Sequence, residues 1–197
     1  MEEFNIVLAG VGGQGILLAS QILGVSAVKE GFNVRVSEIH GMAQRGGAVV
    51  SHVRIGEKAY GPTVLEGNAD VILGFEPLEA LRNIKYASDK TLIIVSKEII
   101  VPTGFSPEPV QYPKFEEIIE KMKIFTEKIV VIDALALARK AGNTITRNIV
   151  LLGALAASNV LPVKNETIEE TIKELVRPAY LEMNLKAFKL GYEAVKK

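Results

Sequence analysis

Four glycines near the start of the chain have the spacing of a turn that can hold an anion. The apolar stretch Ile6–Ala9 runs into Gly10, Gly12, Gly13 and Gly15, and a helical pattern follows at once. Glycine lets the backbone approach a phosphate, and the helix presents its free N–H groups and the positive end of its dipole there. The same spacing also permits tight packing of a strand on a helix, so both interpretations stay open.

Further polar groups accompany these glycines. Gln14, inside the turn, carries a neutral amide that suits either a helix cap or a ligand contact. Residues 37–47, SEIHGMAQRGG, form a polar loop with the imidazole of His40 and the fixed charge of Arg45, whose planar fork suits phosphate or carboxylate. An ordinary surface loop with an ion-paired arginine and a hydrogen-bonded histidine is the alternative. The glycines at which this loop's backbone can approach an anion are Gly41, Gly46 and Gly47.

An open α/β sheet is expected to position these two segments. The pattern predicts a helix over 15–30, which Gly31 ends, and a strand over 34–38. Such a strand–helix–strand unit gives parallel, right-handed strand pairs, and ligands bind beyond the carboxyl ends of the strands. The polar loop is therefore expected beside the glycine turn. Glu38 ends the second strand, where a dinucleotide-binding fold keeps its ribose-binding carboxylate, so an NAD-dependent enzyme is an alternative.

The remaining chain alternates apolar runs with helical patterns. A hairpin turn is predicted at 56–58, and a short return strand from Ala59 would make the sheet mixed. The other predicted strands are 48–55, 70–75, 91–95 and 129–132. The other predicted helices are 77–84, 114–128, 134–140, 148–158, 167–176 and 179–196.

A few residues in this part have predicted roles of their own. Asp133 is expected to cap the helix that follows it, and Glu76 either caps its helix or serves the site. His52 is predicted to be a structural histidine of its strand. The segment Pro102–Pro113 has four prolines and is predicted to be a surface crossing or an arm that faces a partner. The helix over 148–158 is apolar nearly all round, which indicates burial in a core or an interface.

Composition limits the classes of function. The chain has 197 residues and is expected to form a single α/β domain over 1–197. Its 23 basic and 23 acidic residues leave no net charge, which gives no support for nucleic acid or an anionic membrane as a partner. It has no cysteine, so a thiolate nucleophile, a disulfide or a cysteine-ligated iron–sulfur cluster is excluded within it, and its two histidines leave little for a metal site. No signal peptide and no apolar run near 20 residues is seen, so a cytoplasmic protein is expected.

Several segments together resemble the gamma-type subunit of 2-oxoacid:ferredoxin oxidoreductases. They are GVGGQGILLASQIL, SEIHGMAQRGGAVVSHVRIG, ADVILGFEPLEALR, and DALALARKAGN with NIVLLGALA, and they occur in order over nearly the whole chain. The form His-Gly-Met-Ala-Gln-Arg-Gly-Gly is most similar to the small, beta subunit of indolepyruvate:ferredoxin oxidoreductase. Subunits for pyruvate, 2-ketoisovalerate or 2-oxoglutarate are the alternatives within this family.

The resemblance implies a three-layer, Rossmann-like α/β/α fold with a mostly parallel sheet. It implies an enzyme that decarboxylates a 2-oxoacid on thiamine diphosphate, passes electrons to ferredoxin and forms an acyl-coenzyme A. This chain has neither cysteine nor a Gly-Asp-Gly segment, so thiamine diphosphate, Mg and the [4Fe-4S] clusters are implied to lie in a larger alpha subunit. His40, the one candidate for a catalytic role, is implied to hydrogen-bond near the acyl-transfer centre. The residues implied to face coenzyme A are Gly10, Gly12, Gly13, Gln14, Gly15, Gly41, Gln44, Arg45, Gly46 and Gly47.

Three interpretations follow. A subunit of such an oxidoreductase is expected to be inactive or insoluble alone and to form a hetero-oligomer with an apolar interface. A free-standing NAD-binding dehydrogenase is expected to bind a nicotinamide nucleotide as the isolated chain. A non-catalytic nucleotide-binding module is expected to bind its ligand without redox chemistry. The lack of an evident catalytic pair argues against the second, and the ordered resemblance argues against the third.

Overall fold

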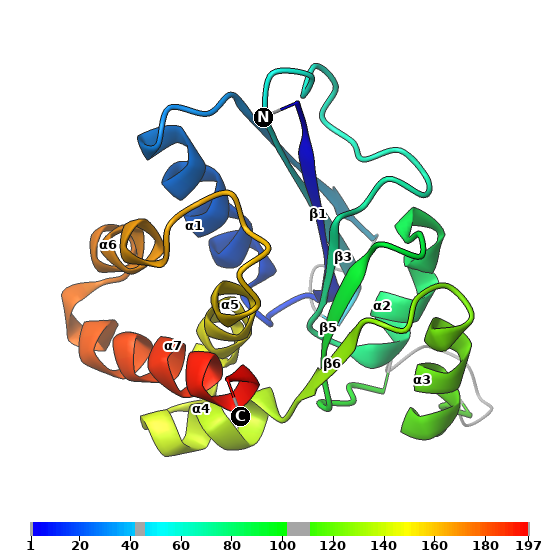
Figure 1. Ribbon diagram of the computed structural model, residues 1–197. Coiled ribbons are helices and arrows are strands. Elements are labelled where there is room, and N and C mark those ends of the chain that lie inside the picture. The colour runs from blue at the N-terminus through cyan, green and yellow to red at the C-terminus, as the bar shows by residue number, and fades with distance from the viewer. Residues whose placement is uncertain (1, 42–45, 102–110, 197) are drawn as a thin grey trace.

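The structure, a computed structural model, describes residues 2–41, 46–101 and 111–196. Within them a six-stranded sheet lies between two layers of helices, which confirms the predicted α/β/α arrangement (Figure 1). The strands are β1 (Phe4–Val11), β2 (Val34–His40), β3 (Ala48–Ile55), β4 (Val71–Gly74), β5 (Leu92–Ser96) and β6 (Ile129–Ile132).

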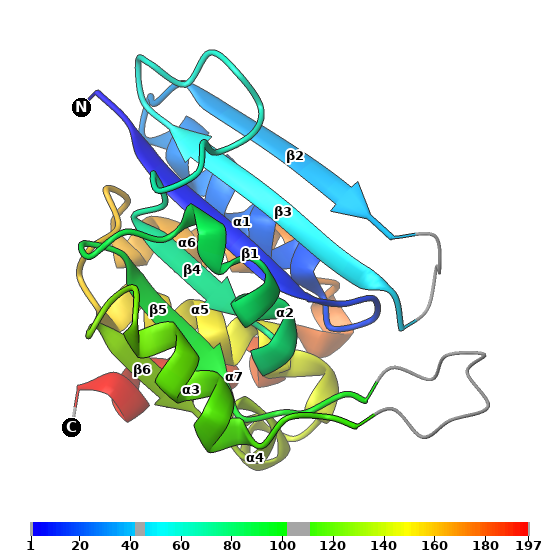
Figure 2. The same cartoon turned by 90° about the vertical axis from the view of Figure 1, so that its right-hand side faces the viewer.

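The helices divide unequally between the two faces of the sheet (Figures 1 and 2). One face carries α2 (Pro77–Arg82) and α3 (Phe115–Lys123). The other carries α1 (Ile16–Lys29), α4 (Ala134–Ala141), α5 (Arg147–Ala157), α6 (Asn165–Leu175) and α7 (Leu181–Val195). Short 3-10 turns, at Ile84–Tyr86, Thr144–Thr146 and Pro178–Tyr180, precede or follow helices. None of the described helices is long and apolar enough to cross a membrane.

The strand order is β2-β3-β1-β4-β5-β6, and it corrects the expected pairing of the first two strands. Strands β1, β4, β5 and β6 are parallel, as predicted for their apolar sequences. Strand β3 instead lies between β1 and β2 and is antiparallel to both (Figure 2). After β2 the chain turns back directly as β3, and a direct return makes an antiparallel pair. The sheet is therefore mixed, and β2 forms its edge.

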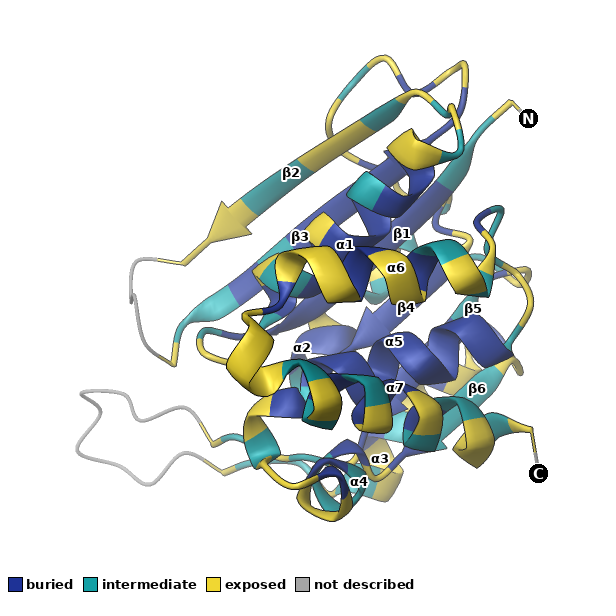
Figure 3. Ribbon diagram, turned by 90° about the vertical axis from the view of Figure 1, so that its left-hand side faces the viewer, coloured by how far each residue is buried: buried dark blue, intermediate teal, exposed yellow. Residues whose placement is uncertain are grey.

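Two apolar cores fill the spaces on either side of the sheet. Along β1, Ile6 and Leu8 face the larger core under α1 and α5, while Val7 faces the smaller core under α2 and α3. This alternation follows from the two-residue period of a strand. Helix α5 is buried at every position from Asn148 to Ala157 and lies between the sheet and the outer helices (Figure 3). The predicted apolar helix is thus a core helix.

Helices α5 and α7 cross with their backbones in contact at two glycines. A Cβ atom built on Gly191 would lie 1.9 Å from the carbonyl oxygen of Val150. A Cβ atom on Gly153 would lie 2.0 Å from the carbonyl oxygen of Phe188. No larger residue fits at these positions without moving one helix. The crossing therefore determines where the N-terminal end of α7 lies.

The segment after β3 is not the predicted hairpin. Residues 56–70 contain no strand, so the expected return strand from Ala59 is wrong. The segment instead lies over the sheet face opposite α1, where Val64 and Ala69 are buried in the smaller core. Polar contacts from the neighbouring strands hold it there in place of strand pairing.

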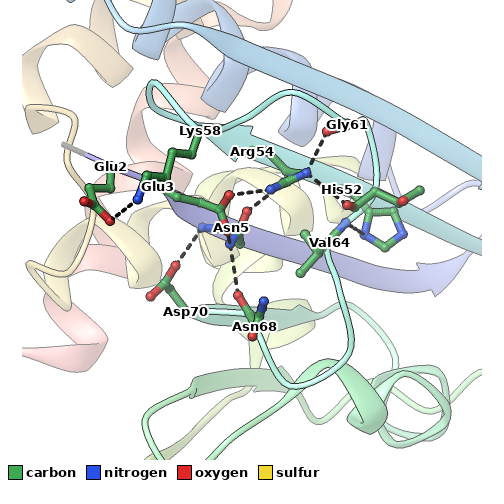
Figure 4. A network of polar contacts seen from close by, with 11 residues as sticks. Glu2, Glu3, Asn5, His52, Arg54, Lys58, Gly61, Val64, Asn68 and Asp70 are labelled. Atoms are coloured by element: carbon green, nitrogen blue, oxygen red, sulfur yellow. Dashed lines mark hydrogen bonds and ion pairs between the residues drawn. The ribbon is translucent and has the colours of Figure 1, made fainter.

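Arg54 is the centre of these polar contacts (Figure 4). Its guanidinium is buried, with 7% of the residue exposed. It donates to Asn5 Oδ1 at 3.0 Å, to the Gly61 carbonyl at 2.8 Å and to the Thr63 carbonyl at 3.3 Å. It also forms an ion pair with Glu3. The network joins β1, β3 and the 56–70 segment.

The structure confirms His52 as a buried strand residue with structural contacts. Its Nδ1 accepts a hydrogen bond from the Val64 amide at 3.4 Å, and its ring meets Tyr86 edge-on, with 5.1 Å between ring centroids. Burial, together with the positive charges of Arg54 and Lys85, lowers its pKa below the ordinary value of 6.5. The folded protein therefore holds His52 neutral at pH values where the unfolded chain protonates it.

Acidification is expected to weaken the fold through this histidine. Because only the unfolded chain takes up the proton near pH 6.5, the free energy of unfolding should fall below that pH, by up to about 1.4 kcal/mol per pH unit. Urea denaturation of the wild type and of His52→Gln, from about pH 8 to about pH 5, measures this. Burial raises the pKa of Asp70 and Glu79, which makes the folded state more stable as the pH falls and so opposes the effect of His52. The test is therefore the difference in pH dependence between the wild type and His52→Gln. Equal pH dependence in both would contradict the prediction.

Two other predictions about this half of the chain have different outcomes. The helix predicted over 114–128 ends at Lys123, because the hydroxyl of Thr126 donates to the Thr91 carbonyl at 2.9 Å and turns the chain toward β6. Most of the predicted arm over 102–113 lies outside the described residues.

Candidate functional site

The glycine turn joins the carboxyl end of β1 to α1. The Gln14 amide donates to the Val11 carbonyl at 3.2 Å and closes the turn. Gly13, at φ 98°, and Gly15, at φ 78°, take the left-handed conformation that glycine adopts at least cost. No atom lies within 4 Å of a Cβ built on Gly13, so the turn faces open space there. No side chain caps α1, and its first turn has no acidic residue, so its N-terminal end suits an anion.

The side chain of Gln14 is hydrogen-bonded to other residues of the protein. Its Oε1 accepts from the Val11 amide at 2.8 Å, and its Nε2 donates to the Phe75 carbonyl at 2.9 Å. Only 2% of the residue is exposed. Gln14 therefore ties the turn to the end of β4, and we do not count it among the groups that face the open side.

Two of the predicted glycines are needed for packing as well. A Cβ on Gly10 would lie 2.6 Å from the Cβ of Phe75. A Cβ on Gly15 would lie 2.7 Å from Nδ2 of Asn148, which donates to the Gly15 carbonyl at 3.2 Å. Tight packing thus accounts for these two glycines, whereas Gly13 has the open surroundings that an anion requires.

The second predicted segment lies beside the turn. The Gly12 amide donates to the Gly47 carbonyl at 2.9 Å, and the Gly41 amide donates to the Ala48 carbonyl at 2.9 Å. Gly46 has a φ of 73° and open space around its Cβ position. Gln44 and Arg45 lie outside the described residues, so their predicted ligand contacts stay predictions.

His40 and Glu38 lie at the end of the edge strand β2. The two side chains are 3.2 Å apart, between Nε2 and Oε2, and His40 is exposed. In a dinucleotide-binding fold the ribose-binding carboxylate ends the strand next to β1. Here β3 occupies that place, and Glu38 is on the strand beyond it. This arrangement argues against the NAD-binding alternative.

The turn, α1 and His40 line one side of a cavity of about 690 Å³. The exposed Leu17 lies on the same side and makes it partly apolar. No carboxylate lines the cavity in the part of the chain that the structure describes. A cavity with an uncapped helix end, an imidazole and no carboxylate in its described lining suits an anionic ligand with an apolar portion.

The other wall of the cavity comes from residues that sequence reasoning did not select. Asn148 lies at the start of α5, and Arg177, Tyr180 and Asn184 lie at the junction of α6 and α7. Asparagine at the head of an otherwise apolar helix, and arginine before Pro178 between two helices, are the only sequence signals for them. These residues lie beside the glycine turn only because of how the helices pack.

Glu76 caps a helix, which is the first of the two roles predicted for it. Its carboxylate accepts from the Glu79 amide at 2.8 Å at the start of α2, and the hydroxyl of Tyr112 also donates to it. Burial, and then the hydrogen bond to Glu76, raises the pKa of Tyr112 far above its usual range. Asp133 likewise caps α4 by accepting from the Ala136 amide at 2.9 Å. Neither carboxylate lines the cavity.

Comparison with known proteins places the chain among oxidoreductase subunits. The chain is 47% identical to indolepyruvate oxidoreductase subunit IorB of Pyrococcus horikoshii, across 100% of this chain and 98% of that protein. It is 30% identical to the pyruvate/ketoisovalerate oxidoreductases common subunit gamma of Pyrococcus furiosus, across 93% of this chain and 92% of that protein.

A solved structure and a family model agree with these relatives. Pyruvate oxidoreductase subunit PORC from Thermotoga maritima matches with a TM-score of 0.74 and 26% identity, across 98% of this chain and 97% of that one. The family model for pyruvate ferredoxin/flavodoxin oxidoreductase matches residues 5–194. With nearly the whole chain matched, this chain belongs to the pyruvate ferredoxin/flavodoxin oxidoreductase family, as a gamma-type subunit.

Proposed function

We propose that this chain is the small subunit of an indolepyruvate (arylpyruvate):ferredoxin oxidoreductase. The enzyme breaks the bond between the carboxylate and the carbonyl carbon of an aryl 2-oxoacid and releases CO₂. Two electrons pass one at a time to ferredoxin, and the acyl carbon joins the sulfur of coenzyme A, whose thiol proton is released. The higher identity to the indolepyruvate relative, 47% against 30% for the pyruvate/ketoisovalerate relative, favours the aryl substrate. Pyruvate, 2-ketoisovalerate and 2-oxoglutarate are the alternatives.

The redox groups of this enzyme are proposed to lie in a larger alpha subunit. The chain has no cysteine, and cysteine thiolates are the usual ligands of iron–sulfur clusters. Thiamine diphosphate and its Mg ion are assigned to the same partner. The functional unit is therefore a hetero-oligomer that passes electrons to ferredoxin, and the isolated small subunit is expected to be inactive.

Within that complex we assign the cavity to coenzyme A, and the observation that carries this is its lining. The uncapped end of α1 and the open glycines Gly13 and Gly46 suit a phosphate, and the apolar portion of the wall suits the pantetheine chain. Arg45 and Gln44 are proposed to add charge and hydrogen bonds from the neighbouring loop. His40, on the wall, is the proposed hydrogen-bonding group nearest the acyl-transfer centre.

Anaerobic co-purification tests the proposed function. The tagged chain, expressed in its native host, should bring down a larger, brown subunit, and the complex should reduce ferredoxin with indolepyruvate only when coenzyme A is present. Assays with phenylpyruvate, pyruvate, 2-ketoisovalerate and 2-oxoglutarate, under the same conditions, identify the substrate class. Isolation of the chain alone, colourless and binding a nicotinamide nucleotide, would contradict the proposal. Faster turnover of pyruvate than of indolepyruvate would reassign the substrate.

A further inference from the structure

The charge on the second wall of the cavity comes from Arg177. It lies between α6 and α7, lines the cavity, and is exposed. Its guanidinium forms no ion pair or hydrogen bond with another residue in the described ranges. By contrast, Arg54 and Arg147 are both paired with carboxylates. An exposed arginine on a cavity wall with no carboxylate in its described lining is suited to bind a phosphate with two parallel hydrogen bonds.

Two buried amides lie on the same wall. Asn148 and Asn184 are 3% and 6% exposed. Each donates its Nδ2 to a backbone carbonyl, of Gly15 at 3.2 Å and of Tyr180 at 2.7 Å respectively, and these bonds orient the amides. In the described part of the chain, neither Oδ1 receives a hydrogen bond. Neither oxygen is among the fully buried unpaired atoms, so both stay open to solvent and can accept hydrogen bonds from a ligand that brings its own donors.

We propose that Arg177, Asn148 and Asn184 form the second half of the ligand site. Arg177 binds a phosphate of the ligand, and the two asparagines accept hydrogen bonds from N–H or O–H groups of its organic part. A phosphorylated nucleotide derivative with amide and amino donors, the chemical class of coenzyme A, satisfies both. The assignment rests on the proposed function and adds the residues that distinguish phosphate-bearing ligands from phosphate-free ones.

Titration calorimetry on the full chain and on the co-purified complex tests this, with coenzyme A, ADP and phosphate-free pantetheine as probes. Arg177→Gln should lower the affinity for coenzyme A and for ADP by about 10-fold or more and leave the affinity for pantetheine unchanged. Arg177→Lys should keep part of the affinity, because it retains the charge without the planar fork. The matched control is Arg139→Gln, which removes an exposed arginine on α4, away from the cavity wall, and should bind like the wild type.

The outcomes separate this inference from the proposed function. Suppose the wild type binds coenzyme A. If Arg177→Gln binds it equally well, or if the variant loses as much affinity for pantetheine as for coenzyme A, the phosphate role of Arg177 is wrong while the proposed function stands. If Arg177→Gln reduces only the yield of the larger subunit, the wall is a protein contact and the inference is also wrong. If neither the chain nor the complex binds coenzyme A, both fail. An unchanged thermal midpoint shows that the variant is folded.

Discussion

Replacing Gly191 with alanine is expected to lower the free energy of unfolding by about 3 kcal/mol or more, at the upper end of overpacking effects. The new methyl group would lie 1.9 Å from the Val150 carbonyl oxygen and 2.8 Å from its carbonyl carbon. Both atoms belong to the backbone of α5, so no side chain can rotate away and a helix must move. The gain in helix propensity from glycine to alanine, about 1 kcal/mol, offsets only part of this cost. Urea denaturation followed by circular dichroism measures the change.

Two controls identify the crossing as the cause. Gly24→Ala places a methyl group in the middle of α1, where it meets the Val36 side chain at 2.9 Å rather than a backbone, and should change stability by less than about 1 kcal/mol. Lys189→Ala changes an exposed residue on α7 itself and should be close to neutral. A denaturation midpoint for Gly191→Ala equal to that of the wild type would show that the helices do not cross this closely.

The same substitution has a consequence for the ligand site. Asn184 is on α7, and Arg177 and Tyr180 lie just before that helix. A shift of α7 away from α5 would therefore change the second wall of the cavity but leave the glycine turn on β1 in place. In protein that remains folded, the affinity for coenzyme A should fall, and calorimetry at low temperature can detect this.

Replacing Arg54 with methionine is expected to cost about 3–5 kcal/mol, the range for removing one partner of a buried ion pair. Methionine keeps much of the apolar stem but leaves Glu3 Oε2, Asn5 Oδ1 and the Gly61 carbonyl without the donor that Arg54 supplies. Each of these acceptors is then partly buried and unpaired, which costs more than the lost attraction itself. Denaturation midpoints measure the loss, and hydrogen exchange should show faster opening of residues 56–70.

A nearby surface pair is the matched control for Arg54. Lys58 and Glu2 lie 2.9 Å apart at the same end of the sheet, but both side chains are exposed to solvent (Figure 4). Lys58→Met should leave the denaturation midpoint almost unchanged, because exposed ion pairs are weak. Adding Glu3→Gln to Arg54→Met should recover part of the lost stability by removing the uncompensated charge. Equal losses of stability for Arg54→Met and Lys58→Met would contradict the prediction that the buried ion pair contributes more than the exposed one.

Features that depend on neighbouring residues were predictable from the sequence alone. The strand–glycine–helix unit around Gly13, the cap at Asp133 and the apolar helix α5 follow from local spacing and apolar periodicity, whereas the sequence left Glu76 open between a cap and the site. The glycine turn and its neighbouring polar loop were also visible, because glycine placement is itself a local signal. The family followed from these segments taken in order along the chain.

Only the tertiary structure decided the positions of elements relative to one another. It placed β3 between β1 and β2, and it brought the Gln14 side-chain amide to the Phe75 carbonyl, 61 residues away. It also brought Asn148 to the Gly15 carbonyl across 133 residues, and placed Arg177 and Asn184 on the same cavity. Such contacts depend on which surfaces pack together. The local spacing of residues does not predict these contacts, because packing energy is shared among residues distant in the chain.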